Sequence, residues 1–200
     1  MIQTFYRIVD RLPMHRIIDR LPGRLRAHMI KNFLRRQNIK ADGLPVLLGR
    51  WPNIHNEGKM CIGANCSFVT YRFQQTFVVR ANAELEIGHD SFFSDGVSVC
   101  ATQSIRIGHH AKLGPRIDIS DYAFHQVSPD APTRCAPVII GNNVWIRANS
   151  MILPGAVIGD HAVIGVSSIV TGEIPAKCLA VGNPARVIKT LHIPDDWLRK

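Results

Sequence analysis

Long uninterrupted apolar runs are missing from this sequence of 200 residues. A helix that spans a membrane needs roughly 18 or more consecutive apolar residues, and no stretch here approaches that length. The N-terminus also carries arginines where a secretory signal peptide keeps its apolar region. We therefore expect the chain to fold in the cytoplasm.

Closely spaced cysteine pairs are missing as well. The five cysteines are scattered along the chain and form no CxxC pair of the kind found in zinc sites or redox couples. They are Cys61, Cys66, Cys100, Cys135 and Cys178. The sequence predicts reduced thiols and no bound metal.

Acidic residues are scarce in the first 40 positions, where ten Lys or Arg stand against Asp10 and Asp19, a net charge of +8. Apolar residues recur there at helical spacing, and Pro13 and Pro22 divide them, which predicts two short helices followed by a longer one. We expect residues 1–60 to form a basic, partly helical segment. It would either cap the following domain or lie on an anionic membrane surface through residues 1–40.

A six-residue period replaces these patterns from about residue 61. Apolar residues follow one another at intervals of six near the C-terminus, and small residues recur four places later. The six apolar positions are Ile140, Ile146, Ile152, Ile158, Ile164 and Val170. An ordinary β-sandwich would not keep so many consecutive positions in phase. The sequence therefore predicts a β-helix of hexapeptide repeats.

In such a fold each six-residue unit forms one short strand and one turn, and three units close a triangular coil. The apolar residue points inward and stacks on its equivalents in the coils above and below. We expect a mainly β chain with a left-handed parallel β-helix over residues 61–189 and a short tail over 190–200.

The segments 138–146 and 152–155, together with 182–189, closely resemble the hexapeptide-repeat acetyltransferases. The Val144-Trp145-Ile146 and Gly182-Asn183-Pro184-Ala185 motifs resemble most closely those of the galactoside, maltose and exopolysaccharide (colanic-acid type) O-acetyltransferases. The resemblance covers about residues 61–189. It implies a homotrimer that transfers acetyl from acetyl-CoA to a hydroxyl of a sugar or glycan precursor, with cofactor sites in clefts between subunits.

His125 is the candidate general base. The repeat is interrupted between Ile119 and Ile140, so residues 121–137 must leave the coil, and His125 lies in this excursion. It also falls where the resembling family places its catalytic histidine. An imidazole can take the proton of a hydroxyl that attacks a thioester and pass it to the departing thiolate. Asp118 or Asp121 would orient this imidazole.

Ser94 and Asp95 occupy the position where the family often has an asparagine that contacts the thioester. This chain departs from the family there. Ser94 would donate a hydrogen bond to the oxyanion of the tetrahedral intermediate, unless a backbone N–H does so. Asp95 would hold the acceptor hydroxyl.

The resemblance also implies a set of acetyl-CoA contacts. Trp145 would form an apolar wall for the pantetheine arm, with Ala148, Val166 and Thr171 beside it. Arg186 and Lys189 stand where the family carries cations for the phosphates.

Three other interpretations are open at this stage. The acceptor could be the nitrogen of an amino sugar, or the β-helix could be a non-catalytic scaffold that displays a basic membrane-binding arm. His109 and His110 raise the question of a γ-type carbonic anhydrase, but the three-histidine zinc pattern is poor. No nucleic-acid-binding module is recognised, so no nucleic-acid partner is expected.

Overall fold

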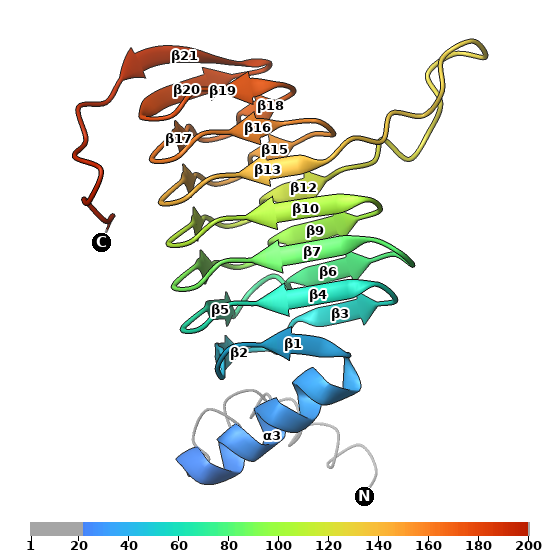
Figure 1. Cartoon of the computed structure of the whole chain (residues 1–200), viewed down its shortest axis with the longest axis vertical. Helices are drawn as coiled ribbons and strands as arrows, with labels where there is room; N and C mark the ends of the chain where they lie inside the picture. Colours follow the sequence, from blue (N-terminus) through green and yellow to red (C-terminus); the bar gives the residue numbers. More distant parts are fainter. Residues whose placement is uncertain (1–21, 200) are drawn as a thin grey trace, which may run out of the picture.

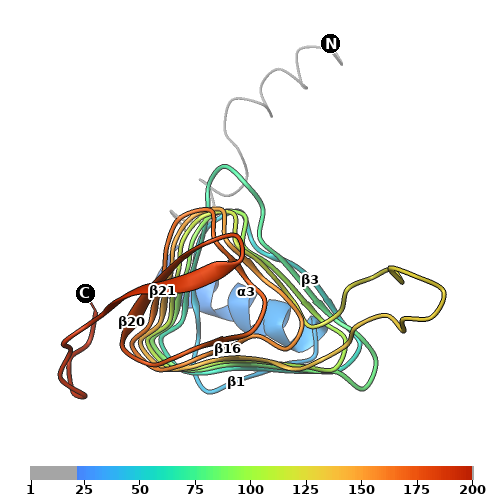
Figure 2. The same ribbon diagram turned by 90° about the horizontal axis from the view of Figure 1, so that it is seen from above.

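The structure, a computed structural model, describes residues 22–199. They form a parallel β-helix that a single helix covers at its N-terminal end (Figure 1). The fold class expected from the repeat is therefore confirmed. Three sheets form the three sides of a triangular prism, which Figure 2 shows from above. We name the corners of the prism A–B, B–C and C–A after the sheets that they join.

Every coil contributes one strand to each sheet in turn. Sheet A consists of β1 (Ile39–Ala41), β4 (Lys59–Ile62), β7 (Glu84–Ile87), β10 (Ser104–Ile107), β13 (Val138–Ile140), β16 (Val157–Ile158) and β19 (Glu173–Ile174). Sheet B consists of β2 (Val46–Gly49), β5 (Ser67–Thr70), β8 (Phe92–Phe93), β11 (Lys112–Leu113), β14 (Trp145–Ile146), β17 (Val163–Ile164), β20 (Cys178–Gly182) and β21 (Ala185–Thr190). Sheet C consists of β3 (Asn53–Asn56), β6 (Thr76–Val79), β9 (Ser98–Ala101), β12 (Asp118–Ser120), β15 (Met151–Ile152) and β18 (Ile169–Val170). Only β20 and β21 pair antiparallel among these strands.

The core is a column of apolar side chains that stack in register along the prism axis. On sheet A, Ile107, Ile140 and Ile158 lie in successive coils and are at most 1% exposed. The outward residues alternate with them along each strand, as the period of two in a strand requires. The chain thus places alternate side chains of each strand in the core, two from longer strands such as β7 and β13 and one from two-residue strands such as β14.

The chain turns many of the corners through residues in the left-handed region of backbone conformation. At the A–B corner six stacked residues have φ between 52° and 63°: Asn65, Asp90, His110, Asn143, His161 and Lys177. Asn, Asp and His are enriched in this region, which accounts for much of this set. A Cβ on Gly108 would lie 2.6 Å from the carbonyl of Gly141 in the next coil. The coils therefore approach too closely at this point for a side chain.

The β-helix begins at Ile39, so the boundary expected at residue 61 is wrong. Ile39 of β1 pairs with Met60 of β4, and the segment 39–56 already forms a complete coil. The helix α3 (Gly23–Arg36) lies across the open end of this coil with Ile30 and Leu34 buried against it. This part of the basic segment is therefore a cap. The two short helices expected before Pro22 fall outside the described residues.

No helix within residues 22–199 combines the length and the apolar character needed to cross a membrane.

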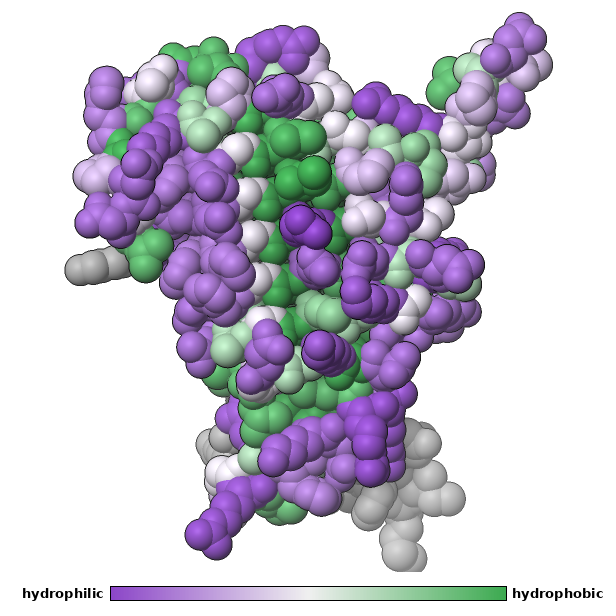
Figure 3. All heavy atoms as spheres, viewed as in Figure 1, coloured by the Kyte–Doolittle hydropathy of each residue, from purple (hydrophilic) through white to green (hydrophobic). Residues whose placement is uncertain are grey.

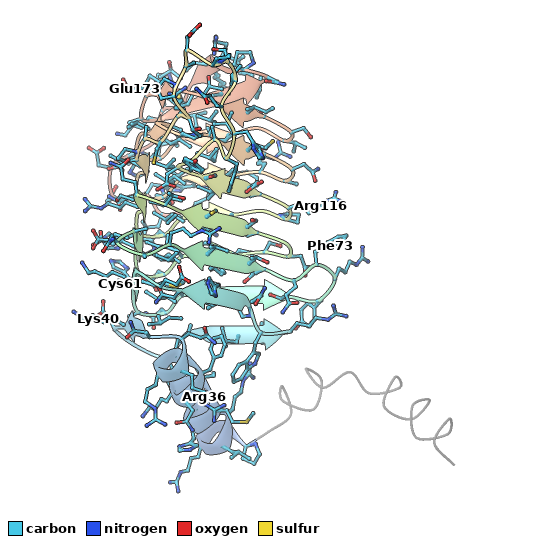
Figure 4. All side chains as sticks on the ribbon, turned by 90° about the vertical axis from the view of Figure 1, so that its right-hand side faces the viewer. Arg36, Lys40, Cys61, Phe73, Arg116 and Glu173 are labelled. Atoms are coloured by element: carbon cyan, nitrogen blue, oxygen red, sulfur yellow. The ribbon has the colours of Figure 1, made fainter. Side chains whose placement is uncertain are left out.

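Two loops project from the prism. Residues 121–137, which we call the excursion, leave the coil between β12 and β13 and extend outward from the C–A corner (Figures 1 and 2). A shorter loop over residues 71–75 leaves the B–C corner between β5 and β6. Figure 4 shows Phe73 on this loop and Arg116 in a coil above it. The Arg116 guanidinium lies 5.5 Å from the centre of the Phe73 ring.

Candidate active site

His125 lies in the excursion and is exposed to solvent. Its backbone N–H donates to the carbonyl of Ala123 at 2.7 Å, and Phe124 between them has a φ of 62°. No hydrogen-bond partner for the imidazole is found among residues 22–199. In Figure 2 the excursion points away from the body of the prism. A single chain therefore presents this histidine outward, toward whatever lies beside the C–A corner.

Asp121 anchors the base of the excursion. It is fully buried, and its carboxylate accepts hydrogen bonds from the backbone N–H groups of Thr102, Gln103 and Ser104, each at 2.7 Å. Both carboxylate oxygens are thereby engaged. The proposed role of Asp121 in orienting the imidazole of His125 is wrong for this conformation. Asp118, the other carboxylate considered for that role, lies on the outer face of sheet C before the excursion begins.

A groove of about 580 Å³ runs over sheet B and brings Ser94 and Trp145 together. The floor of the groove is made by outward side chains of three neighbouring strands, β8, β11 and β14. These side chains are Phe92, Lys112 and Trp145, which pair in register. Ser94 follows β8 and lines the same groove. Two residues that are 51 positions apart in sequence are thus joined by coil stacking.

Cations surround the aromatic floor of this groove. The guanidinium of Arg147 lies 5.2 Å from the centre of the Trp145 ring, and that of Arg199 lies 5.8 Å from it. Lys112 lines the groove as well, together with one carboxylate residue, Asp90. An apolar floor with several cations suits a ligand that has both an apolar arm and anionic groups.

Ser94 and Asp95 have different surroundings. The backbone N–H of Ser94 donates to the carbonyl of Leu113 at 2.9 Å, and its carbonyl accepts from the Gln75 amide at 2.8 Å. Its hydroxyl has no hydrogen-bond partner within residues 22–199, so it is free to donate to a ligand. The Asp95 Oδ1 atom accepts from two backbone N–H groups of the 71–75 loop, at 2.5 and 2.9 Å. Asp95 therefore fastens that loop, a contact that sequence reasoning did not anticipate.

The other expected cofactor residues are spread over three parts of the prism. Ala148 and Val166 lie at the B–C corner, beside the groove, and Val166 is 47% exposed. Thr171 is exposed at the C–A corner, on the same edge as the excursion. Arg186 and Lys189 are exposed on β21. One chain does not gather all of them into a single pocket.

A second hollow, of about 320 Å³, continues the groove along sheet B toward the C-terminal end of the prism. Val163 and Leu179 form its floor, in register with Trp145, and Lys189 stands at its edge. Sheet B thus carries an extended surface between Ser94 and Lys189. Its length and its mixture of apolar and basic side chains suit an extended ligand.

Phe92, Lys112 and Arg199 line the groove but were not predicted from the sequence. Phe92 and Lys112 each precede an inward-pointing residue, as Trp145 precedes Ile146. The repeat phase could therefore have identified them as neighbours of Trp145. Arg199 follows the last repeat, and no signal in the repeat pattern points to it.

A group of metal-binding residue types lies at the A–B corner. Ligand atoms of His89, Asp90 and His110 lie within 4.8 Å of one another. Tetrahedral zinc holds its ligand atoms about 3.4 Å apart, from bond lengths near 2.1 Å, so this group would have to rearrange around an ion. His109 has a structural role there, because its Nδ1 accepts the backbone N–H of His89 at 3.1 Å. Burial and the neighbouring imidazoles lower the pKa of His109, which favours its neutral form.

Comparison with known proteins identifies the repeat. Residues 137–172 match the family model for the bacterial transferase hexapeptide (six repeats). The chain is 34% identical over 138 residues to the galactoside O-acetyltransferase of Lactococcus lactis, covering 67% of this chain and 64% of that protein. It is 32% identical over 116 residues to the Escherichia coli galactoside O-acetyltransferase, covering 56% and 57% respectively. The chain thus spans about three fifths of the length of the curated relatives that it matches.

A solved structure shares the fold over most of the chain. The hexapeptide-repeat acetyltransferase VCA0836 of Vibrio cholerae, determined in complex with acetyl-CoA, superimposes with a TM-score of 0.58 at 24% identity. The match covers 90% of this chain and 84% of that one. The resemblance to hexapeptide-repeat transferases is therefore confirmed in sequence over the repeats and in fold over nearly the whole described chain.

Proposed function

Because the chain carries the hexapeptide repeat of bacterial transferases in both its sequence and its coil, we propose that it is an acetyl-CoA-dependent O-acetyltransferase. The acceptor is a hydroxyl of a sugar or glycan precursor. The galactoside O-acetyltransferases among its relatives and the acetyl-CoA complex of its structural neighbour support this assignment. The rest of the proposal comes from the geometry of the site.

The observation on which the proposed active site rests is that His125 and the groove on sheet B lie on different sides of one chain. The excursion leaves the C–A corner, while sheet B lies on the opposite side of the prism (Figure 2). A base on one side and a cofactor surface on the other cannot act together within one chain. They meet only if the excursion of one copy reaches sheet B of another.

The outer faces of the three sheets support a closed ring of three copies. Sheet A carries the ion pairs Lys59–Glu84 and Arg106–Glu86. Figure 3, which looks toward this sheet, shows a hydrophobic stripe down its middle, with hydrophilic side chains on both sides and in places across it. The ion pairs of this face suit contact with water. Sheets B and C carry few charges outward, and we assign them to the subunit interface.

In a threefold ring with the B–C corners toward the axis, sheet B of one copy faces sheet C of the next. Residues of the same coil then lie at the same height, so Lys112 on sheet B meets Asp118 on sheet C, and Trp145 meets Met151. Burial raises the pKa of Asp118 in the single chain. A lysine from the neighbouring copy would pair with this outward-facing carboxylate and stabilise its charged form.

The same ring places the C–A corner of one copy beside the A–B corner of the next. The strands that carry Phe92, Lys112 and Trp145 begin at that A–B corner. The excursion of one copy therefore reaches the groove of its neighbour, and each trimer has three equivalent sites. This arrangement accounts for the dispersal of the expected site residues over separate edges of one chain.

Within such a site the acetyl-CoA arm lies along sheet B with its thioester toward Ser94. The acceptor hydroxyl attacks the thioester carbon while His125 removes its proton. The Ser94 hydroxyl donates to the developing oxyanion. The carbon–sulfur bond then breaks, and the imidazolium returns the proton to the CoA thiolate. Transfer is direct, and His125 ends in its starting state.

Acetylation of an amino-sugar nitrogen would use the same base and the same groove. The test is incubation of the purified chain with acetyl-CoA and a panel of sugars and amino sugars, with product analysis by mass spectrometry and NMR. Acetyl esters on sugar hydroxyls support the proposal. Acetamides as the sole products would assign the nitrogen acceptor, and no acetyl transfer to any acceptor would support a non-catalytic scaffold.

We also propose a cytoplasmic location, with the basic N-terminal segment at the inner surface of the membrane. Within the described residues α3 supports this location, because its outer face exposes Lys31, Arg35 and Arg36. Sedimentation with anionic vesicles at low salt, but not with neutral vesicles, is the expected result. Equal recovery of the chain in the supernatant with both vesicle types would contradict it.

A further inference from the structure

The last residues of the described chain form a strap over residues 191–199. It runs back from β21 beside the A–B corner (Figure 1). An ion pair between Lys177 and Asp195 holds its middle. Near its end the Asn143 side chain donates to the carbonyl of Trp197 at 2.8 Å and accepts from the Arg199 N–H at 3.0 Å. Because Asn143 is 1% exposed, the strap is fastened to the rigid coil rather than to a loop.

This fastening places the Arg199 guanidinium in the middle of sheet B. It lies 5.0 Å from the ring centre of Trp197 and 5.8 Å from that of Trp145. Arg199 lines both the groove that contains Ser94 and the hollow that contains Lys189. Its side chain therefore stands between the two ends of the extended surface.

The guanidinium of Arg199 is only partly satisfied. Its terminal nitrogen donates to the carbonyl of His161 at 3.3 Å. Its Nε is buried, and no acceptor for it exists among residues 22–199. Burial lowers the pKa of Arg199, and within residues 22–199 no carboxylate opposes that effect. A partly desolvated cation without a counter-charge in the described chain is costly to keep, which indicates a site prepared for an anion.

We infer that Arg199 binds a phosphate group of acetyl-CoA and that the C-terminal strap is part of the cofactor site. The inference rests on the proposed function. A guanidinium matches phosphate through parallel charge-assisted hydrogen bonds. With the thioester at Ser94, the nucleotide end of the extended cofactor points toward Lys189, and Arg199 lies along that path. The residue lies outside residues 137–172, which match the hexapeptide family model, so the strap adds a contact that the repeat does not encode.

The test compares the wild-type chain with Arg199→Ala and Arg199→Lys in calorimetric titrations with CoA and with pantetheine, which has no phosphate. Arg199→Ala should raise the Kd for CoA about tenfold or more, as loss of a charge-assisted hydrogen bond predicts. Arg199→Lys should recover part of the loss. The Kd for pantetheine should not change. Arg106→Ala, which removes an exposed arginine paired with Glu86 on sheet A, is the matched control and should leave both values unchanged.

In steady-state assays Arg199→Ala should raise KM for acetyl-CoA while kcat changes little, because the phosphates lie far from the reacting carbon. Equal CoA affinity in wild type and Arg199→Ala would overturn the inference and leave the proposed function standing. An equal loss of pantetheine affinity would overturn it too, because the arginine would then act on the fold of the groove. A wild-type chain that binds no CoA would refute the proposed function itself, and the inference with it.

Discussion

Two side chains of the excursion region have opposite surroundings. Asp121 is fully buried and holds three backbone N–H groups, whereas the imidazole of His125, four residues later, is exposed and unpaired within the described chain. Buried polar groups are normally satisfied, and exposed ones are free to meet a ligand. The contrast indicates that Asp121 holds the base of the loop, and it leaves the imidazole of His125 free for its proposed role as general base. The two roles can be tested separately.

Replacement of the proposed base should affect turnover alone. We predict that His125→Ala lowers kcat by a factor of about 10² to 10⁴, as loss of a general base does, while the Kd for CoA and the oligomeric mass stay unchanged. Steady-state kinetics, calorimetry and analytical ultracentrifugation measure the three quantities. His28→Ala is the matched control, because His28 is an exposed histidine on the cap helix α3, where its Nε2 pairs with the Asn32 amide at 2.8 Å. Near-normal kcat in His125→Ala would remove this residue from the mechanism.

Replacement of Asp121, which holds the base of the excursion, should lower the stability of the fold. We predict that Asp121→Asn lowers the free energy of unfolding by about 1.5 to 3 kcal/mol, the value of a hydrogen bond to a charged group. An amide cannot accept at both of its terminal atoms, so at least one backbone N–H is left without its acceptor. Chemical denaturation measures the change. An unchanged midpoint would show that the base of the excursion is held by other contacts.

An aromatic cluster in the early coils is expected to contribute strongly to the stability of the fold. Phe77 is fully buried at the centre of an aromatic cluster, 5.7 Å from the ring of Phe68 and 5.9 Å from that of Phe93. We predict that Phe77→Ala lowers the free energy of unfolding by about 3 to 5 kcal/mol, because truncation leaves a cavity that the rigid coils cannot fill. Val127→Ala, at a residue 95% exposed in the excursion, should change it by less than about 0.5 kcal/mol. Equal effects would contradict the aromatic cluster as part of the core.

The late coils were predictable from the sequence because their strands keep the six-residue phase. Ile140 pairs with Ile158, 18 residues later, as three six-residue units require. In the early coils most strands are four residues long and the spacing varies: Ile39 pairs with Met60, 21 residues later. A search for a fixed period therefore finds the coils after residue 61 and misses the first one. In the early coils the register is set by burial of alternate residues within longer strands. This alternation is a weaker signal in sequence than a fixed six-residue period.

The candidate site was predictable only in part. His125 and Trp145 were selected through the interrupted repeat and the resemblance, and the structure places Trp145 in the lining of a groove. The contacts of Asp95 and Asp121 with backbone N–H groups 17 to 24 residues away could not be predicted, because they depend on which corner each loop leaves. Arg199 depends on the path of the strap, which no repeat specifies.

At the scale of the whole molecule, different sides of the prism carry different features. Sheet A carries ion pairs, sheet B carries the groove, and the C–A corner carries the excursion. A helix caps one end and the β20–β21 hairpin lies at the other (Figure 1). The central claim is that the base of one copy and the groove of the next form each active site.

Subunit complementation tests this claim most directly. His125→Ala and Trp145→Ala chains are each expected to be nearly inactive at low acetyl-CoA concentration, and they are mixed in equal amounts under conditions that exchange subunits. If each site takes its histidine from one copy and its groove from the next, random mixing gives an intact pair at about one site in four. We predict that the mixture recovers about a quarter of wild-type activity. Activity that stays at the mean of the two parent variants, despite proven exchange of subunits, would contradict a site shared between copies.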